Sequence, residues 1–95
     1  MILEVAVLDV RPGQRREFEA AFAEAEPLIA RAGGHIGHEL RRCVEDANRF
    51  LLLVEWETLE DHTEGFRGSE DYQRWREILH HFYDPFPVVQ HYVDR

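Results

Sequence analysis

The second half of this chain gathers histidine and aromatic side chains that could carry out proton transfer. His62, His80 and His81 are candidates for the titrating group, because an unperturbed imidazole has a pKa of about 6.5. The phenol of Tyr72 could donate a proton. We expect His62 and Tyr72 to act as catalytic residues in a snug and mostly apolar pocket. The residues expected to line that pocket are Trp56, Phe66, Trp75, His81 and Phe82.

Ordinary core packing is the competing interpretation for several of these residues. Trp56 and Trp75 stand at core spacing, where an aromatic side chain is more often buried filler than the wall of a site. His62 lies in the first turn of a short helix and could simply form a local hydrogen bond. His35 and His38, which flank the second predicted strand, are expected at the surface.

The sequence contains no pattern that predicts a metal site or a bound cofactor. His80 and His81 are adjacent, and neighbouring residues on a helix point about 100° apart, so they cannot hold one ion together. The single cysteine, Cys43, can form neither an intramolecular disulfide nor a structural zinc site.

The charge and hydropathy of the sequence restrict the kinds of molecule that the chain can bind. Nineteen acidic and eleven basic side chains give a net charge of −8, which repels nucleic acid and anionic membrane surfaces. No apolar run approaches the length of a membrane span. The N-terminus lacks the basic and small-residue features of a signal peptide, so we expect a cytoplasmic protein.

The elements that position these residues can be read from the hydrophobic periodicity. Ninety-five residues predict a single domain, 1–95. Three helices are expected. The first is long, the second is short and begins at Thr58 with Asp61 in a capping box, and the third is capped by Ser69. The strands are expected at 2–10, 36–43, 49–57 and 88–93, and the long helix at 14–32.

This order, β-α-β-β-α-β, is typical of the ferredoxin-like α+β fold. In that fold a four-stranded antiparallel sheet carries its helices on one face. Strand 49–57 places Phe50, Leu52, Val54 and Trp56 on one side but Leu51 and Leu53 on the other. Because two helices can cover only one face, the second apolar face predicts a homodimer.

Two segments carry a resemblance to a known family. Residues 56–62 (WETLEDH) end a strand in Trp, pass through an acidic turn and place His62 at the start of a helix. Residues 69–75 (SEDYQRW) are followed by Phe82 and by a closing strand that contains His91 and Tyr92. In order and length these features resemble the antibiotic-biosynthesis monooxygenase family along essentially the whole chain.

The resemblance implies a dimeric α+β barrel with a cavity between each sheet and its helices. Some members oxidise phenolic or anthrone-type polyketides to quinones with O₂ and no cofactor. The expected function is therefore that of a cofactor-independent monooxygenase acting on an aromatic, phenol- or anthrone-type small molecule. The alternative is a non-catalytic dimeric binding or accessory domain on the same scaffold, since a fold does not fix a function.

The sequence departs from the family pattern in two respects. Haem-degrading members use an Asn on the first strand and a Trp early in the helix, whereas residues 1–10 contain no Asn and the early helical position is His62. Haem degradation therefore fits less well. An additional turn, residues 65–68 (GFRG), separates His62 from Ser69 and is expected to reshape the mouth of the pocket.

Overall fold

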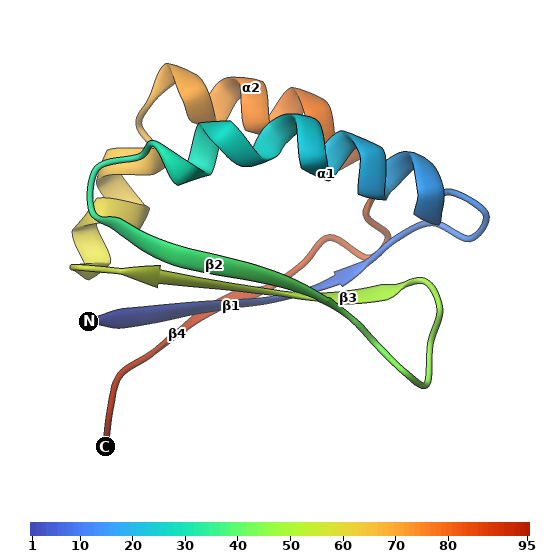
Figure 1. Cartoon of the computed structure of the whole chain (residues 1–95), viewed down its shortest axis with the longest axis horizontal. Helices are drawn as coiled ribbons and strands as arrows, with labels where there is room; N and C mark the ends of the chain where they lie inside the picture. The colour runs from blue at the N-terminus through green and yellow to red at the C-terminus, as the bar shows by residue number, and fades with distance from the viewer.

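A computed structural model describes all residues, 1–95, and has the predicted element order. The four strands form one antiparallel sheet in the order β2-β3-β1-β4, and both long helices lie over one of its faces (Figure 1). This confirms the ferredoxin-like α+β arrangement, with β2 at an edge of the sheet. The elements are β1 (Ile2–Asp9), α1 (Arg15–Ala30), β2 (His35–Arg42), β3 (Arg49–Trp56), η1 (Asp61–Phe66), α2 (Glu70–Leu79), η2 (His80–Phe82) and β4 (Val89–Tyr92).

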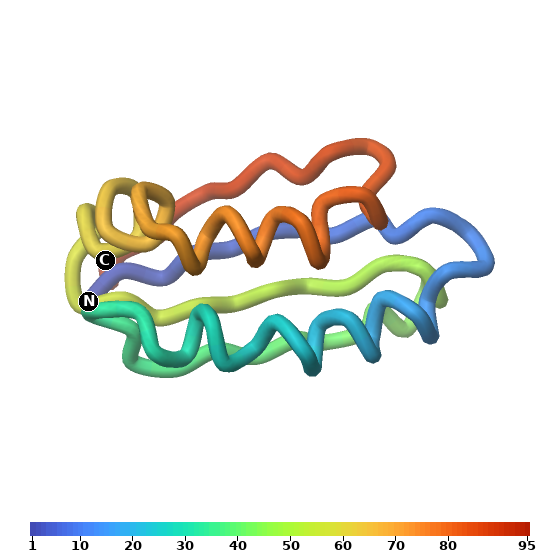
Figure 2. The backbone as a smooth tube through the Cα atoms, turned by 90° about the horizontal axis from the view of Figure 1, so that it is seen from above, coloured from blue at the N-terminus to red at the C-terminus, as the bar shows by residue number.

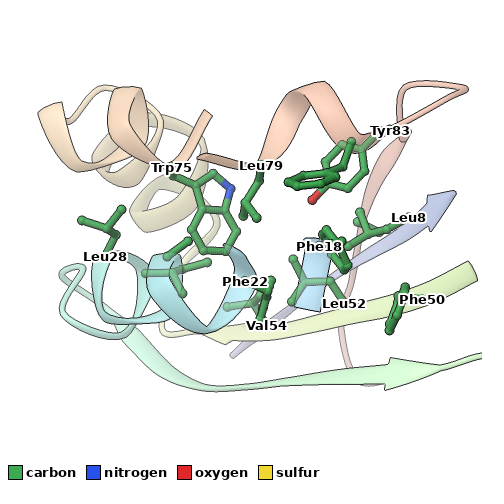
Figure 3. Packing of buried hydrophobic residues seen from close by; sticks show 14 of the residues in the cluster. Leu8, Phe18, Phe22, Leu28, Phe50, Leu52, Val54, Trp75, Leu79 and Tyr83 are labelled. Carbon is green, nitrogen blue, oxygen red and sulfur yellow. The ribbon is translucent and has the colours of Figure 1, made fainter. Parts of the chain in front are cut away.

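The core lies between the helices and the inner face of the sheet (Figure 3). Period-two alternation sends every second side chain of β1 and β3 inward, and the helical period gives α1 and α2 one apolar side each. Phe18 of α1 illustrates the packing, with its ring centroid 5.0 Å from that of Phe50 on β3. Trp75 of α2 meets Phe22 of α1 at 5.8 Å, so aromatic contacts join the two helices to each other.

The outer face of the sheet carries a band of apolar side chains that no element of the chain covers. Direct strand partners lie on the same face, and Val5 pairs with Leu53 while Val7 pairs with Leu51. Val7 is 43% exposed. We call this surface the outer face; its apolar members are Leu3, Val5, Val7, Leu51, Leu53 and Tyr92.

A short π-helix, η1, stands where the sequence predicts a helix beginning at Thr58. The predicted capping box is confirmed, because the Asp61 amide donates to the Thr58 hydroxyl and the Thr58 amide donates to the Asp61 carboxylate, both at 3.1 Å. Ser69 caps α2 as predicted, accepting the Tyr72 amide at 3.1 Å. Of the predicted additional turn, residues 65 and 66 belong to η1, and residues 67 and 68 form the turn that follows it.

Several elements end together at one end of the molecule. Ile2 pairs with Trp56 and Leu3 pairs with Tyr92, so the start of β1 lies beside the ends of β3 and β4. Figure 2 shows η1, in yellow, at the same end as both termini. Neither α1 nor α2 has the length and the apolar surface needed to traverse a bilayer.

Candidate functional site

A buried carboxylate lies at the end of the sheet where β1, β3 and β4 meet. Glu4 of β1 is only 5% exposed, because the alternation of the strand points it inward together with Ala6 and Leu8. The indole N–H of Trp56 donates to Glu4 Oε1 at 2.9 Å. Burial raises the pKa of Glu4, and the Trp56 hydrogen bond and the charge of Arg67 oppose that shift.

His62 of η1 covers this carboxylate. Its Nε2 lies 3.3 Å from Glu4 Oε1, and its ring stacks on the Trp56 indole with centroids 5.3 Å apart. The residue is 4% exposed. Burial, with the nearby charges of Arg67 and His91, lowers the pKa of His62 to about 3, so the imidazole is neutral at pH 7.

His91 of β4 completes the cluster. Its register opposite Glu4 puts it on the inner face, and its Nε2 lies 2.8 Å from His62 Nδ1. His91 is half-buried, so it is the member of the cluster nearest to solvent. Burial and the charge of Arg67 lower the pKa of His91 as well. We call Glu4, Trp56, His62 and His91 the buried acid–histidine cluster.

Two hydrogen bonds join the members of this cluster. Glu4 Oε1 accepts the Trp56 indole N–H at 2.9 Å, and it also lies 3.3 Å from His62 Nε2. The second hydrogen bond joins His62 Nδ1 and His91 Nε2, and the tautomers of the two rings decide which nitrogen donates. No buried side-chain nitrogen or oxygen in the chain lacks a partner. A carboxylate beside one imidazole, which in turn is hydrogen-bonded to a second imidazole, is an arrangement suited to general acid–base chemistry.

The remaining predicted site residues divide into two groups. Phe66 lies beside the cluster, with its ring 5.9 Å from Trp56, and contacts Tyr72 at 5.4 Å and Trp75 at 5.8 Å. Tyr72 is half-buried, whereas Trp56, Phe66 and Trp75 belong to the hydrophobic core.

His81 and Phe82 lie at the other end of α2, on η2. Phe82 is core packing against Phe18, and the exposed His81 ring lies on Phe82 at 4.2 Å. The structure therefore brings His62, Trp56, Phe66 and Tyr72 into one neighbourhood and leaves His81 and Phe82 outside it.

Two members of the cluster, Glu4 and His91, are absent from the sequence-based set of candidates. A polar residue in phase with Ala6 and Leu8 on an otherwise apolar inner face was the available signal for Glu4. His91 had no comparable signal, because its role depends on the register of β4 against β1.

A second acid–histidine group corrects the prediction that His35 and His38 are surface residues. His38 has a side chain only 12% exposed, with Nε2 2.7 Å from Glu26 Oε2 and Nδ1 2.9 Å from His35 Nε2. The physical reason is register, since His38 lies opposite Val54 and therefore points inward under α1. This second group lies next to the first, because the ring centroids of His35 and Trp56 are 6.0 Å apart.

The larger hollows of the surface lie away from His62. The largest, of about 610 Å³, opens between α1 and the β2 edge and is lined by Phe22, Glu26, Leu40, Arg42 and Phe50 among others. No group of three or more His, Cys, Asp or Glu side chains is arranged to hold a metal ion.

Comparison with known proteins identifies the family of this chain. Residues 1–78 match the antibiotic biosynthesis monooxygenase family. The chain belongs to that family. This confirms the resemblance drawn from residues 56–62 and 69–75.

Several relatives of this monooxygenase-family chain are similar over nearly their full length. The uncharacterized protein YczJ of Bacillus subtilis is 54% identical over 94 residues, which is 99% of either chain. The crystal structure of a Bordetella bronchiseptica protein with the same family name has a TM-score of 0.93 at 39% identity, covering 99% of this chain and 96% of that one. SnoaB of Streptomyces nogalater, a cofactor-independent oxygenase, shares the fold at 20% identity, with a TM-score of 0.78 and coverage of 99% and 92%.

Proposed function

We propose that this chain is a cofactor-independent monooxygenase that oxidises a phenol- or anthrone-type aromatic molecule with O₂. The observation that carries the proposal is the buried carboxylate–imidazole pair, Glu4 and His62, stacked against the indole of Trp56. Family membership and the fold shared with SnoaB support the same reaction class.

The reaction needs a base, an apolar site and little water. In an anthrone, the imidazoles of the cluster take a proton from the CH₂ carbon, and the resulting enolate gives one electron to O₂. The organic radical and superoxide recombine to form a C–O bond, and the peroxide takes up a proton, for which Tyr72 is the proposed donor. Loss of the second C–H proton breaks the O–O bond. The balance is R₂CH₂ + O₂ → R₂C=O + H₂O.

The geometry supports these roles through burial. His62 and Glu4 are each about 95% shielded from water, so charge that develops beside them is weakly screened. The rings of Trp56 and Phe66 provide an apolar surface next to the base. His91, which is half-buried, provides the side from which a ligand would approach.

The homodimer is part of the proposal. The outer face has no cover within the chain, and a second copy packed about a two-fold axis would bury the same residues on both partners. A cytoplasmic location likewise stays a prediction, which cell fractionation would check.

Oxygen consumption tests the reaction. Purified protein, without added cofactor, is expected to accelerate O₂ uptake by a member of a panel of anthrones and hydroquinones. His62→Ala should slow that uptake about a hundredfold or more, the usual contribution of a positioned acid–base group. Gln73→Ala, at an exposed position of α2, is the matched control. Uptake equal to the uncatalysed rate across the whole panel would contradict the proposal.

A second candidate, a non-catalytic dimeric binding domain, is favoured by one specific observation. Trp56, Phe66 and Trp75, which were expected to line a pocket, are packed into the core, and the larger hollows lie elsewhere. Equilibrium dialysis separates the candidates, because a binding domain would retain an aromatic ligand without consuming O₂. Saturable haemin binding with a sharp Soret shift would instead revive haem degradation, which the family resemblance disfavours.

A further inference from the structure

The largest hollow of the surface lies between α1 and the β2 edge of the sheet. Figures 1 and 2 show α1 running along β2 in the opposite direction. Pairing with β3 puts three side chains of β2 on the inner face of the sheet, namely His38, Leu40 and Arg42. The facing side of α1 carries Glu19, Phe22 and Glu26, whose spacing of three and four residues places them on one side of the helix. We call the space between these two rows the α1–β2 hollow.

The α1–β2 hollow has the size and the apolar floor of a small-molecule site. Its volume is about 610 Å³, and small-molecule sites commonly have about 300–1,000 Å³. In its floor, Phe22 and Phe50 are buried and Leu40 is half-buried. Such a floor favours the apolar part of a ligand.

Three charged side chains line the same hollow, and each has bonding capacity left for a ligand. Arg42 takes part in none of the ion pairs of the chain. Glu19 has one ion pair, with Arg15 on the preceding turn of α1, and its distance is 3.7 Å. Glu26 Oε2 lies 2.7 Å from His38 Nε2, whereas its Oε1 has no hydrogen-bond partner within the chain. The hollow therefore offers two carboxylates on α1 and one guanidinium on β2.

The order of these charges along the hollow follows from the antiparallel course of α1 and β2. Glu26 lies at the His38 end, so Glu19, two turns earlier on α1, lies toward the Arg42 end. Two turns separate the carboxylates by about 10 Å along the helix axis. The two ammonium groups of an extended lysine are about 7 Å apart at ordinary bond lengths, and the flexible glutamate side chains can cover the difference. Lysine thus has two cations, one anion and an apolar stem, which complement the two carboxylates, the guanidinium and the floor.

We propose that the α1–β2 hollow binds a free basic α-amino acid of the lysine type. The α-carboxylate pairs with Arg42 and the α-ammonium pairs with Glu19. The side-chain ammonium reaches Glu26, and the methylene stem lies on Phe22 and Leu40. The net charge of −8 attracts a ligand with a net positive charge. The site is independent of the monooxygenase proposal, because it uses no residue of the buried acid–histidine cluster.

Calorimetric titration of the wild-type protein at low salt tests the site with lysine and three analogues. Norleucine lacks the side-chain ammonium, cadaverine lacks the carboxylate and ε-aminocaproate lacks the α-ammonium. Lysine is expected to bind saturably and each analogue about tenfold more weakly, the usual effect of losing one charged hydrogen bond. Equal binding of cadaverine and lysine would overturn the inference, because a general attraction of cations to the acidic chain would then account for both. Absence of saturable binding at millimolar lysine would overturn it too.

Substitutions then assign each charge of the ligand to its partner. Arg42→Gln should remove the preference for lysine over cadaverine, and Glu26→Gln should remove the preference for lysine over norleucine. Arg74→Gln and Glu24→Gln remove the same charges at exposed positions outside the hollow, so both preferences should persist in these controls. Persistence of the preferences in Arg42→Gln and Glu26→Gln would contradict the site.

The NMR signals of the histidine rings locate the bound ligand independently of the variants. The His38 ring contacts Glu26, and its centroid lies 6.4 Å from that of Phe22, so its signals should move during the lysine titration. His81, exposed on η2, should show no change. A His38 signal that stays in place while lysine binds would overturn the inference. Lysine binding without any O₂ uptake would instead contradict only the oxygenase proposal.

Discussion

At the scale of single residues, a carboxylic acid on the inner face of a strand needs hydrogen-bond donors. Glu4 accepts a hydrogen bond from the Trp56 indole N–H at 2.9 Å, and His62 Nε2 lies 3.3 Å from the same oxygen. An unpartnered buried polar group costs about 1–3 kcal/mol, so these contacts are what allow the residue to remain inside. The same carboxylate oxygen thus faces both the Trp56 indole and the His62 imidazole.

Substitution at Glu4 should separate hydrogen bonding from charge. Glu4→Gln keeps an acceptor for Trp56 while removing a charge that burial disfavours, so we expect the free energy of unfolding at pH 8 to be unchanged or higher. Glu4→Leu leaves the indole N–H without a partner and should cost about 1–3 kcal/mol. Urea unfolding measures both. Equal losses in the two variants would mean that the carboxylate charge, and not the hydrogen bond, stabilises the fold.

The pH dependence of the free energy of unfolding should show that His62 is neutral in the folded chain. As the pH falls from 6.5 toward about 3, the unfolded chain takes up a proton at this position that the folded chain excludes. Stability therefore falls with decreasing pH in that window, by up to about 1.4 kcal/mol per pH unit for one proton. The pKa of Glu4 is raised above its ordinary 4.5, so above that pH this residue makes the free energy of unfolding fall as the pH rises.

The difference between wild type and His62→Gln isolates the histidine, since Glu4 is present in both. The variant should lose less stability than wild type between pH 6.5 and about 4, measured by urea unfolding at several pH values. Parallel curves would contradict the burial of a neutral imidazole at this position.

At the scale of elements, the sequence predicted the features that depend on neighbouring residues. It did not predict the contacts that depend on how distant strands pair. The Thr58–Asp61 box and the Ser69 cap could be predicted because each involves residues three apart. The π-helical form of η1 could not, because an i→i+5 bond has no distinct side-chain signature. The partnership of Glu4 with Trp56 spans 52 positions and depends on the pairing of β1 with β3.

Contact between Gly34 and η1 helps to fix the position of His62. Gly34 has a φ of +83°, and a Cβ there would overlap the Asp61 carboxylate at the start of η1. Gly34→Ala should lower the free energy of unfolding by at least about 2 kcal/mol, from backbone strain and displacement of Asp61. It should also slow O₂ uptake, because His62 follows Asp61 directly.

Gly33→Ala provides the control for this prediction. A Cβ at Gly33 meets nothing within 4 Å, and its φ is not in the left-handed region. We expect a change within about 0.5 kcal/mol. Similar losses in the two variants, measured by thermal and urea unfolding, would show that the contact with Asp61 does not constrain η1.

At the scale of the whole molecule, the sheet has one covered face and one uncovered face. Both helices lie on the inner side (Figure 1). The strand register places apolar side chains of β1, β3 and β4 on the outer face. Large continuous apolar patches are rare on monomeric proteins. The two-faced pattern was visible in the sequence because period-two alternation requires no knowledge of register.

Replacing Leu51 or Leu53 with Asp tests whether a second copy covers the outer face. Each substitution would place a carboxylate in an apolar interface, at a cost of several kcal/mol unless it protonates, so we expect dissociation or unfolding. Wild-type protein should sediment as a dimer at micromolar concentration, and its melting temperature should rise with protein concentration. Glu57→Ala, at an exposed position just beyond β3, should change neither property. A wild-type species with the mass of one chain would contradict the dimer, because the outer face would then have to be stable in water.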